Sequence, residues 1–451
     1  MPSVSYTTPG VYIEEDTSLS LSISTSPTAI PVFIGKFLKV NGEQPELVTC
    51  IKINSWLDFI SQFSLPTLTV SIKVDSGKKI DSTGSEILIS NNANKFNATA
   101  ELPLNLGAFA VQHYFSNGGG PCYILPLVAN SDLATLPDLI EKQQEITLLV
   151  CPETDVTLSP IKKSDVYSNI NTLLQGNKID YFLIADSEDG EYKSSTQEDK
   201  TAVYYPNLKT PFTYTLPPDK SITLEGYSVE TISNLAELNK PATLDDYNEA
   251  KKSINDAINN NIKPIVLPPS AAVAGAYATT DSTRGVWKAP ANVVLRDAIP
   301  DTMITDKDQS ELTSKGINAI RYFVNKGTVI WGARTLVSQE TPDWLYVPVR
   351  RLFNSVERDI EKAMQFAVFE PNSQPTWERV RSAIDNYLYQ LWQQGALMGN
   401  SPKEAYFVHI GKDITMSDDD IKNGKMIVKV GMAAVRPAEF IILQFSQNIA
   451  Q

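Results

Sequence analysis

The chain has 451 residues, a length that predicts two or three domains rather than a single core. Its formal net charge of −13 argues against a nucleic-acid-binding protein, which normally carries a basic surface. No apolar run is long enough to cross a membrane, and the opening MPSVSYTTPG lacks the charged start and apolar stretch of a signal peptide. We therefore expect a protein that is made in the cytoplasm.

The N-terminal stretch, residues 3–34, contains no Lys or Arg and alternates between apolar and polar residues. Prolines at positions 9, 27 and 31 interrupt this strand-like pattern. An extended segment ahead of the first domain has unpaired backbone groups, so we expect it to add to a sheet edge in its own subunit or in a neighbouring one.

The following residues alternate between apolar strand patterns and helix patterns, which is typical of a mixed α/β domain. The short helix pattern at 55–63 begins with Ser55, a favourable N-cap. The other expected elements are strands at 31–37, 146–153 and 179–186, a helix at 160–176, and a helix, glycine turn and strand over 106–127.

Two polar stretches interrupt this alternation, at about 64–103 and 206–262. The first is rich in β-formers and turn residues and predicts an inserted hairpin unit. The second ends in a plausible exposed helix at 245–261 with few large apolar residues. We expect two separate insertions.

The C-terminal part contains two strongly amphipathic helix patterns, at 349–369 and 375–397, followed by strands at 426–435 and 438–448. All of the arginines lie between Arg284 and Arg436, and five of the six tryptophans lie in the same part. Arg and Trp are residues of buried ion pairs and of interface anchors. Two interpretations remain open for this part: a larger core or an interface.

The stretch PPSAAVAGAYATTDSTRGVWKAPAN, residues 268–292, opens this C-terminal part. Its two prolines end the preceding strand, and its small residues allow a closely packed helix or turn. Arg284 and Trp287 are therefore predicted to be structural residues at a junction between domains.

Residues that could organise catalysis are scarce. The two histidines, His113 and His409, lie in a helix pattern and in a strand pattern, and neither has a metal-binding spacing. The three cysteines are far apart, which favours reduced buried thiols over a disulfide framework. We expect no catalytic, cofactor-binding or metal-binding residues, and an enzyme that uses His409 or Asp281 remains an alternative.

Several stretches together resemble the contractile tail sheath family of phage tails, pyocins and related contractile injection systems. The resemblance covers the first 35 residues, 104–206 and nearly everything from 264 onwards. The chain departs from the family at its two insertions and at Ala271–Ala272, where a Gly–His pair is usual. The similar stretches, in family order, are TPGVYIEE, NGGGPCYI, the 268–292 block, KGINAIRYFVNKGTVIWGARTL, VPVRRLFNSVERDI, FAVFEPN and GMAAVRPAEFIILQF.

This resemblance implies an α+β subunit of several domains. Residues 1–30 would form an N-terminal arm and the first strand of an inner domain, 31–270 an outer domain, and 271–451 the inner domain ending in a strand arm. Such subunits stack as six-fold rings around an inner tube, and the stack contracts to drive the tube into a target cell. The chain length is similar to that of sheaths from released extracellular particles of the antifeeding-prophage and virulence-cassette type.

The family further implies the partners and the residues that meet them. The partners are further copies, sheath paralogues, the tube protein, and baseplate or tail-terminator proteins; no cofactor, nucleic acid or membrane is involved. The residues expected in arms between subunits are Tyr6, Val11, Tyr12, Ile13, Phe440, Ile442, Leu443 and Phe445.

A charged face of the second amphipathic helix is a candidate for contact with the tube. Glu378, Arg379, Arg381 and Asp385 fall outside its apolar face, although an ordinary solvated surface explains them equally well. The β-rich insertion at 64–103 leaves a different function open, that of a surface adhesin that binds a target receptor.

Overall fold

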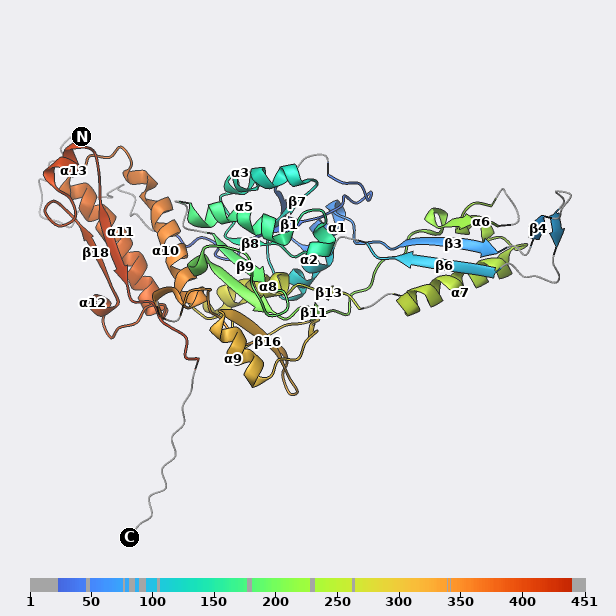
Figure 1. Ribbon diagram of the computed structural model, residues 1–451. Coiled ribbons are helices and arrows are strands. Elements are labelled where there is room, and N and C mark those ends of the chain that lie inside the picture. The colour runs from blue at the N-terminus through green and yellow to red at the C-terminus, as the bar shows by residue number, and fades with distance from the viewer. Residues whose placement is uncertain are drawn as a thin grey trace, which may run out of the picture. The chain divides into compact units, whose positions relative to one another are not determined.

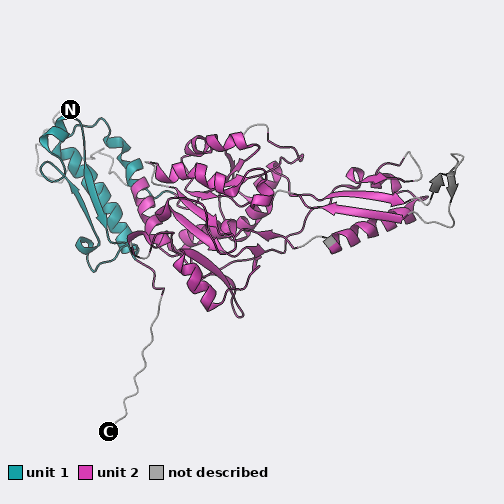
Figure 2. Cartoon of the chain, in the orientation of Figure 1, with its two compact units in different colours: residues 1–26, 359–435 teal, residues 27–358, 436–451 magenta. Residues whose placement is uncertain are grey.

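The computed structural model forms two compact units, coloured separately in Figure 2. Unit 1 contains described residues 23–26 and 359–435, and unit 2 contains described residues within 27–358 and 436–439. Residues 271–358, which the family resemblance led us to expect in an inner domain of residues 271–451, fall in unit 2, and that domain division stays a prediction. The structure describes residues 23–45, 49–75, 78–80, 86–88, 95–103, 106–176, 181–227, 232–261, 264–338, 340 and 342–439.

Unit 2 is organised around a nine-stranded sheet with the order β14-β17-β16-β10-β9-β8-β1-β7-β2 (Figure 1). The six strands from β16 to β7 run parallel, and antiparallel strands complete both sides. The strands are β1 (Pro31–Gly35), β2 (Ile51–Ile53), β7 (Cys122–Pro126), β8 (Leu148–Val150), β9 (Phe182–Asp186), β10 (Thr201–Tyr205), β14 (Val293–Val294), β16 (Ile317–Phe323) and β17 (Gly327–Ile330).

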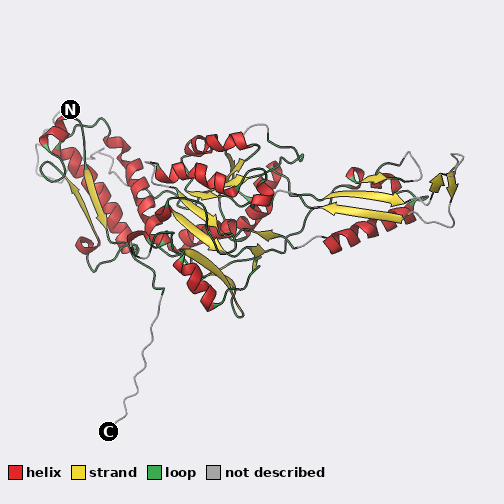
Figure 3. Cartoon of the chain, viewed as in Figure 1, coloured by secondary structure: helices red, strands yellow, loops and turns green. Residues whose placement is uncertain are grey.

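Both faces of this sheet are buried, because successive side chains of a strand point to opposite faces. In β1, Phe33 belongs to one core cluster, whereas Val32 and Ile34 belong to the other. The first cluster includes side chains of α2 (Gly107–Ser116) and α8 (Ser270–Arg284), and the second includes side chains of α3 (Leu136–Glu141) and α5 (Lys163–Gln175). Helices thus cover both faces, and the expected α+β class is confirmed (Figure 3).

Shorter elements surround this layered core. A three-stranded sheet has the order β13-β11-β15. The short helix expected after Ser55 is present, and the Ser55 side chain accepts a hydrogen bond from the Asp58 amide. The remaining elements are α1 (Trp56–Gln62), η1 (Asn130–Thr135), α4 (Asp155–Leu158), η2 (Glu198–Lys200), β11 (Leu208–Lys209), β13 (Val266–Leu267), β15 (Ile299–Pro300), α9 (Asp306–Ser314) and η4 (Pro342–Trp344).

The two polar insertions form one module rather than two. Strand β3 (Thr69–Asp75) of the first insertion pairs antiparallel with β6 (Lys95–Glu101) and parallel with β12 (Thr223–Glu225) of the second. Helix α7 (Leu244–Asn261) packs against β6, and the two insertions share one apolar cluster. The neighbouring elements are β4 (Lys78–Ile80), β5 (Glu86–Leu88), η3 (Asp219–Ser221) and α6 (Leu235–Leu238).

Unit 1 combines one long helix with a two-stranded sheet. The helix α11 (Gln374–Gln393) packs against β18 (Tyr406–Ile410), which pairs antiparallel with β19 (Val428–Met432). Alternate β18 side chains are buried, and so are the expected α11 positions Val380, Ile384, Leu388 and Leu391. Two short helices, α12 (Pro402–Ala405) and α13 (Asp418–Lys422), complete the unit.

Helix α10 (Val347–Met364) is shorter than the periodic pattern at 349–369 predicted. It gives way to the turn η5 (Gln365–Ala367), and Phe369 then has a φ of 69°. A positive φ is incompatible with a continuing right-handed helix, and Pro371 cannot donate to one. Apolar spacing continued beyond the helix because the loop carries apolar residues of its own.

Candidate anchoring sites of the terminal segments

The stretch at 268–292 is a buried structural helix rather than a loop. In α8 the side chains from Ala271 to Ala274 are fully buried. A Cβ on Gly275 would lie 2.6 Å from the backbone oxygen of Tyr114, so only glycine permits this close approach of α8 to α2. Further along the helix, the Tyr277 hydroxyl lies 2.7 Å from that of Tyr204.

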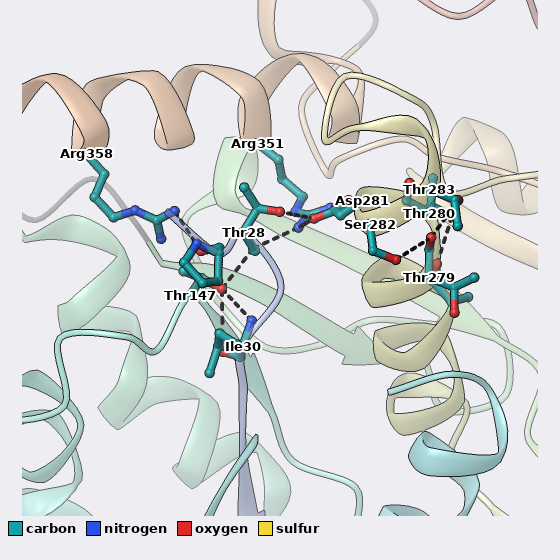
Figure 4. Close-up of polar contacts among 12 residues, drawn as sticks. Thr28, Ile30, Thr147, Thr279, Thr280, Asp281, Ser282, Thr283, Arg351 and Arg358 are labelled. Carbon is teal, nitrogen blue, oxygen red and sulfur yellow. Dashed lines mark hydrogen bonds and ion pairs between the residues drawn. The ribbon is translucent and has the colours of Figure 1, made fainter. Parts of the chain in front are cut away.

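A buried ion pair at the C-terminal end of α8 holds the chain just before β1 (Figure 4). Arg351 of α10 donates to both carboxylate oxygens of Asp281, over 3.0 Å and 2.6 Å. The same guanidinium donates to the backbone oxygen of Thr28 at 3.0 Å, and the Thr28 hydroxyl donates to Asp281 at 2.5 Å. Three segments that are distant in sequence therefore meet at one charge pair.

Two further contacts fix the path of the chain at residues 27–30. Arg358, about two turns further along the same face of α10, donates to the backbone oxygen of Pro27 at 2.7 Å. Thr147 donates to the Thr28 backbone oxygen and accepts a bond from the Ile30 amide, both over 2.9 Å. These contacts satisfy backbone groups just ahead of the central sheet and set the register in which the chain enters β1.

Burial makes the Arg351–Asp281 pair important for stability. Arg351 is 3% exposed, and its guanidinium also lies 4.7 Å from the ring centroid of Tyr277. Removing one member of such a pair leaves the other charge buried without compensation, which costs about 3–5 kcal/mol. We name Thr28, Thr147, Asp281, Arg351 and Arg358 the N-terminal clamp.

A second ion pair holds the other end of the described chain. Glu439 is the last described residue, and its carboxylate accepts two bonds from Nε of Arg334 at 3.0 Å and one from Nη2 at 2.5 Å. The hydrogen bond with Glu439 raises the pKa of Arg334 above its usual value. The Arg334 backbone is itself fixed, because its amide and carbonyl both bond to the Asn318 side chain. We name Arg334, Asn318 and Glu439 the C-terminal clamp.

The two predicted junction residues are less buried than expected. Arg284 is exposed, and Trp287 is only partly buried. The Trp287 ring occupies the space beside Gly285, where an added Cβ would lie 2.4 Å from it. The buried anchor in this stretch is Asp281, which sequence reasoning had considered as a catalytic residue and which the structure shows bound to Arg351.

The four charged residues of α11 lie on its solvent side, and two of them form an ion pair with each other. Glu378, Arg379 and Asp385 are exposed, and Arg381 is partly buried. Arg381 pairs with Glu378, and Arg379 lies 3.7 Å from Glu370 in the preceding loop. The structure thus places these side chains on the accessible side of α11, and their contact with a tube stays a prediction.

The eight residues predicted for the arms, Tyr6, Val11, Tyr12, Ile13, Phe440, Ile442, Leu443 and Phe445, lie outside the described residues. The described chain contains the points at which both terminal segments are attached. Sequence reasoning missed Thr28, Thr147, Arg351 and Glu439. The concentration of arginines in the C-terminal part was the only signal for them, because partners this distant in sequence leave no local pattern.

The histidines and cysteines are the remaining candidates for catalysis or metal binding, and each has the surroundings of a structural residue. His113 is buried, its Nε2 lies 2.9 Å from the backbone oxygen of Arg296, and burial lowers the pKa of its imidazole. His409 is exposed on β18 beside Phe407. Burial raises the pKa of Cys50 and of Cys151 to about 12. Over the described residues, the structure contains no group of acidic, His and Cys side chains suited to a metal ion and no helix able to cross a membrane.

Comparison with known proteins assigns the family. The phage tail sheath protein central domain matches residues 143–336, and the phage tail sheath C-terminal domain matches residues 339–448. A chain in the cryo-EM structure of the anti-feeding prophage helical sheath in the contracted state is 42% identical, with a TM-score of 0.70. The match covers 98% of this chain and 100% of that one. The protein therefore belongs to the contractile tail sheath family.

Two further matches place it among particular relatives. A chain of the PVC sheath complex, an extracellular contractile injection system solved in its contracted state, is 38% identical over 99% of both chains, with a TM-score of 0.66. The tail sheath protein of Vibrio phage KVP40 is 30% identical over 138 residues, which is 29% of this chain but only 20% of the phage protein. The protein is a structural subunit of a contractile sheath, and the adhesin alternative finds no support.

Proposed function

We propose that copies of this chain stack as six-fold rings around an inner tube, and that contraction of the stack drives the tube into a target cell. The particle acts outside the bacterium that makes it. Besides its own copies, the subunit meets sheath paralogues, the tube protein, and baseplate or tail-terminator proteins. The matches to helical sheath and baseplate structures support this proposal.

The observation that carries it is the small sheet of unit 1. Among the described residues, β18 and β19 pair only with each other, while α11 covers one face. Packing against α11 stabilises this sheet, but a two-stranded sheet has two outer edges whose backbone donors and acceptors can pair with an added strand. Terminal segments of neighbouring subunits complete it by strand addition, at about 1 kcal/mol net for each backbone hydrogen bond.

The two clamps suit this mechanism because they resist tension. Residues 27–30 are held by Arg351, Arg358 and Thr147, and Glu439 is held by Arg334. An arm that joins two subunits during contraction pulls on its point of attachment. Charge pairs with several hydrogen bonds, the first buried and the second partly exposed at Glu439, keep these points fixed, so the pull acts on the whole unit rather than unravelling β1.

The strand-addition mechanism is tested with prolines in the C-terminal segment. Successive amides of a strand point to opposite sides, so one of the two changes Ile442→Pro and Leu443→Pro removes a donor to the partner strand. We expect that variant to lose long sheaths in electron micrographs. The controls Ile442→Ala and Leu443→Ala keep every donor, and assembly is expected to persist. Normal sheaths from both proline variants would contradict strand addition by this segment.

The contact with the tube is tested separately. We propose that the α11 face bearing Glu378, Arg379, Arg381 and Asp385 lies against the tube and releases it on contraction, because exposed ion pairs are individually weak. Arg379→Glu combined with Arg381→Glu is expected to give sheaths that form but lack a tube in micrographs. The control exchanges Lys403 and Lys412 for Glu elsewhere in unit 1. Tube-filled sheaths from the arginine variant would contradict this assignment.

A further inference from the structure

The loop between α10 and α11 presents an aromatic side chain to solvent from strained backbone. Phe369 is fully exposed, at 102% of its reference area, and Val368 before it is 61% exposed. The φ of Phe369 is 69°, a strained conformation that bulky residues rarely adopt. The free subunit therefore gains nothing from this phenyl ring and is destabilised by its backbone.

The loop is held in place despite this strain. The amide of Glu370 donates to the backbone oxygen of Ala367 at 3.2 Å, and the Asn372 side chain donates to the backbone oxygen of Lys425 at 2.9 Å. The same Asn372 accepts a bond from the indole of Trp377 at 2.7 Å. The backbone that carries Phe369 is thus held in a hydrogen-bonded loop, which lowers the entropy lost when a partner binds.

Arg379 of α11 adds contacts to two other residues near this loop. Its guanidinium lies 5.8 Å from the ring centroid of Phe366 and 3.7 Å from the Glu370 carboxylate. The charges beside the loop are therefore paired within unit 1, while the apolar pair Val368–Phe369 is left uncovered. An aromatic anchor with a polar rim is the usual composition of a binding hot spot.

We propose that Phe369, with Val368, inserts into an apolar socket on a second copy of this chain in the assembled sheath. Each copy has a net charge of −13, so copies repel one another and an uncharged anchor suits their contact. A protruding residue that fits a different surface of the next copy makes a head-to-tail contact, which repeats into rings or helical assemblies. The inference rests on the proposed self-assembly and assigns one contact within it.

Unit 2 of the second copy offers apolar surface of this kind. Ile299, Tyr322 and Val324 are all substantially exposed. The strand that contains Tyr322 pairs with β17, and β15, which contains Ile299, packs against both. Tyr322 lies on β16, Val324 in the turn that follows it and Ile299 on the neighbouring β15, so this part of unit 2 carries several exposed apolar side chains.

The strained backbone allows a test in which folding and assembly change in opposite directions. Phe369→Gly removes the ring and relieves the positive φ, so the melting temperature of the free subunit is expected to rise slightly. The critical concentration for polymerisation is expected to rise at least tenfold, as for loss of a hot-spot residue. Phe369→Asn, which also tolerates a positive φ, serves as a second variant without an apolar ring. Phe369→Leu keeps an apolar side chain and is expected to stay within about threefold of the wild type.

A crosslinking measurement identifies the partner. A photoreactive benzoylphenylalanine at position 369 is expected to yield a covalent dimer of this chain in assembled particles and no adduct in the free subunit. Exclusive adducts with the tube protein, or wild-type polymerisation by both the Gly and Asn variants, would overturn the inference. A wild-type chain that never polymerises would overturn the proposed sheath assembly as well.

Discussion

The two sheets of this molecule differ in how far the described chain completes them. In unit 2, helices cover both faces of a nine-stranded sheet, and antiparallel strands extend it on either side. In unit 1, two strands pair with each other beneath a single long helix. The first sheet has helices on both faces and strands closing both sides, whereas the second has two described strands, and we propose that further strands complete it. We propose that the subunit uses the first sheet as a body that folds on its own and the second as a site that neighbouring subunits complete.

The largest expected effect is a change in amide hydrogen exchange on assembly, which tests the contrast between the sheets of the two units. Amides of β18 and β19 are expected to exchange more than a hundredfold more slowly in assembled sheaths than in the free subunit. The reason is that several added backbone bonds contribute about 1 kcal/mol each. Amides of β8 and β9 are already buried and are expected to change little. Equal protection of β18 in both states would break the contrast.

The next effect tests whether unit 2 depends on the N-terminal clamp. Arg351→Ala is expected to lower the free energy of unfolding by about 3–5 kcal/mol, because it leaves Asp281 charged and buried without its partner. Urea denaturation of the free subunit measures this change. Arg284→Ala is the control, at the C-terminal end of α8, the helix that contains Asp281; because Arg284 is exposed, this change is expected to alter the free energy of unfolding by less than about 0.5 kcal/mol. Similar values for the two variants would show that the clamp does not stabilise unit 2.

The buried carboxylate of Glu153 in unit 2 predicts that the free energy of unfolding depends on pH. Burial raises the pKa of Glu153 to about 6, although its oxygens accept bonds from Thr157 and from the amides of Leu106 and Gly107. The folded state then holds the proton more tightly than the unfolded state. Its contribution to stability is present below the ordinary pKa of 4.5 and is lost as the pH rises through about 6.

The size of that loss follows from the shift in pKa. A change of about 1.5 units corresponds to about 2 kcal/mol. The free energy of unfolding of the wild type, relative to Glu153→Gln, is expected to fall by that amount between pH 4.5 and pH 7. The other carboxylates titrate in both proteins and cancel. A difference that stays constant with pH would mean that Glu153 remains ionised in the folded protein.

The smallest expected effect is the loss of stability on truncating Trp287. A fully buried indole would have made this loss large. Because Trp287 is only partly buried, Trp287→Ala is expected to lower the free energy of unfolding by about 1–2 kcal/mol. Thermal unfolding of the isolated subunit measures it. A loss above about 3 kcal/mol would mean that this side chain supports α8 more strongly than its exposure indicates.

Local patterns predicted the elements that depend on local properties. Ser55 caps its helix, the apolar spacing of α11 identified its buried face, and β8 and β9 lie within the strands that apolar runs predicted. The pattern failed where the loop after α10 is also apolar, so that the helix was predicted to continue to Phe369. It failed again for the two insertions, which share one core although more than a hundred residues separate them.

The sequence by itself determined the family, the absence of long apolar spans, the α+β class and the importance of its arginine-rich part, because composition and ordered motifs can be read along the chain. Only the tertiary structure decided that Asp281 rather than Arg284 is the buried anchor of the 268–292 stretch, and that its partner is Arg351. It likewise decided that Glu439 meets Arg334. The physical reason is that charge pairing acts through space, and no local periodicity records which distant groups are buried together.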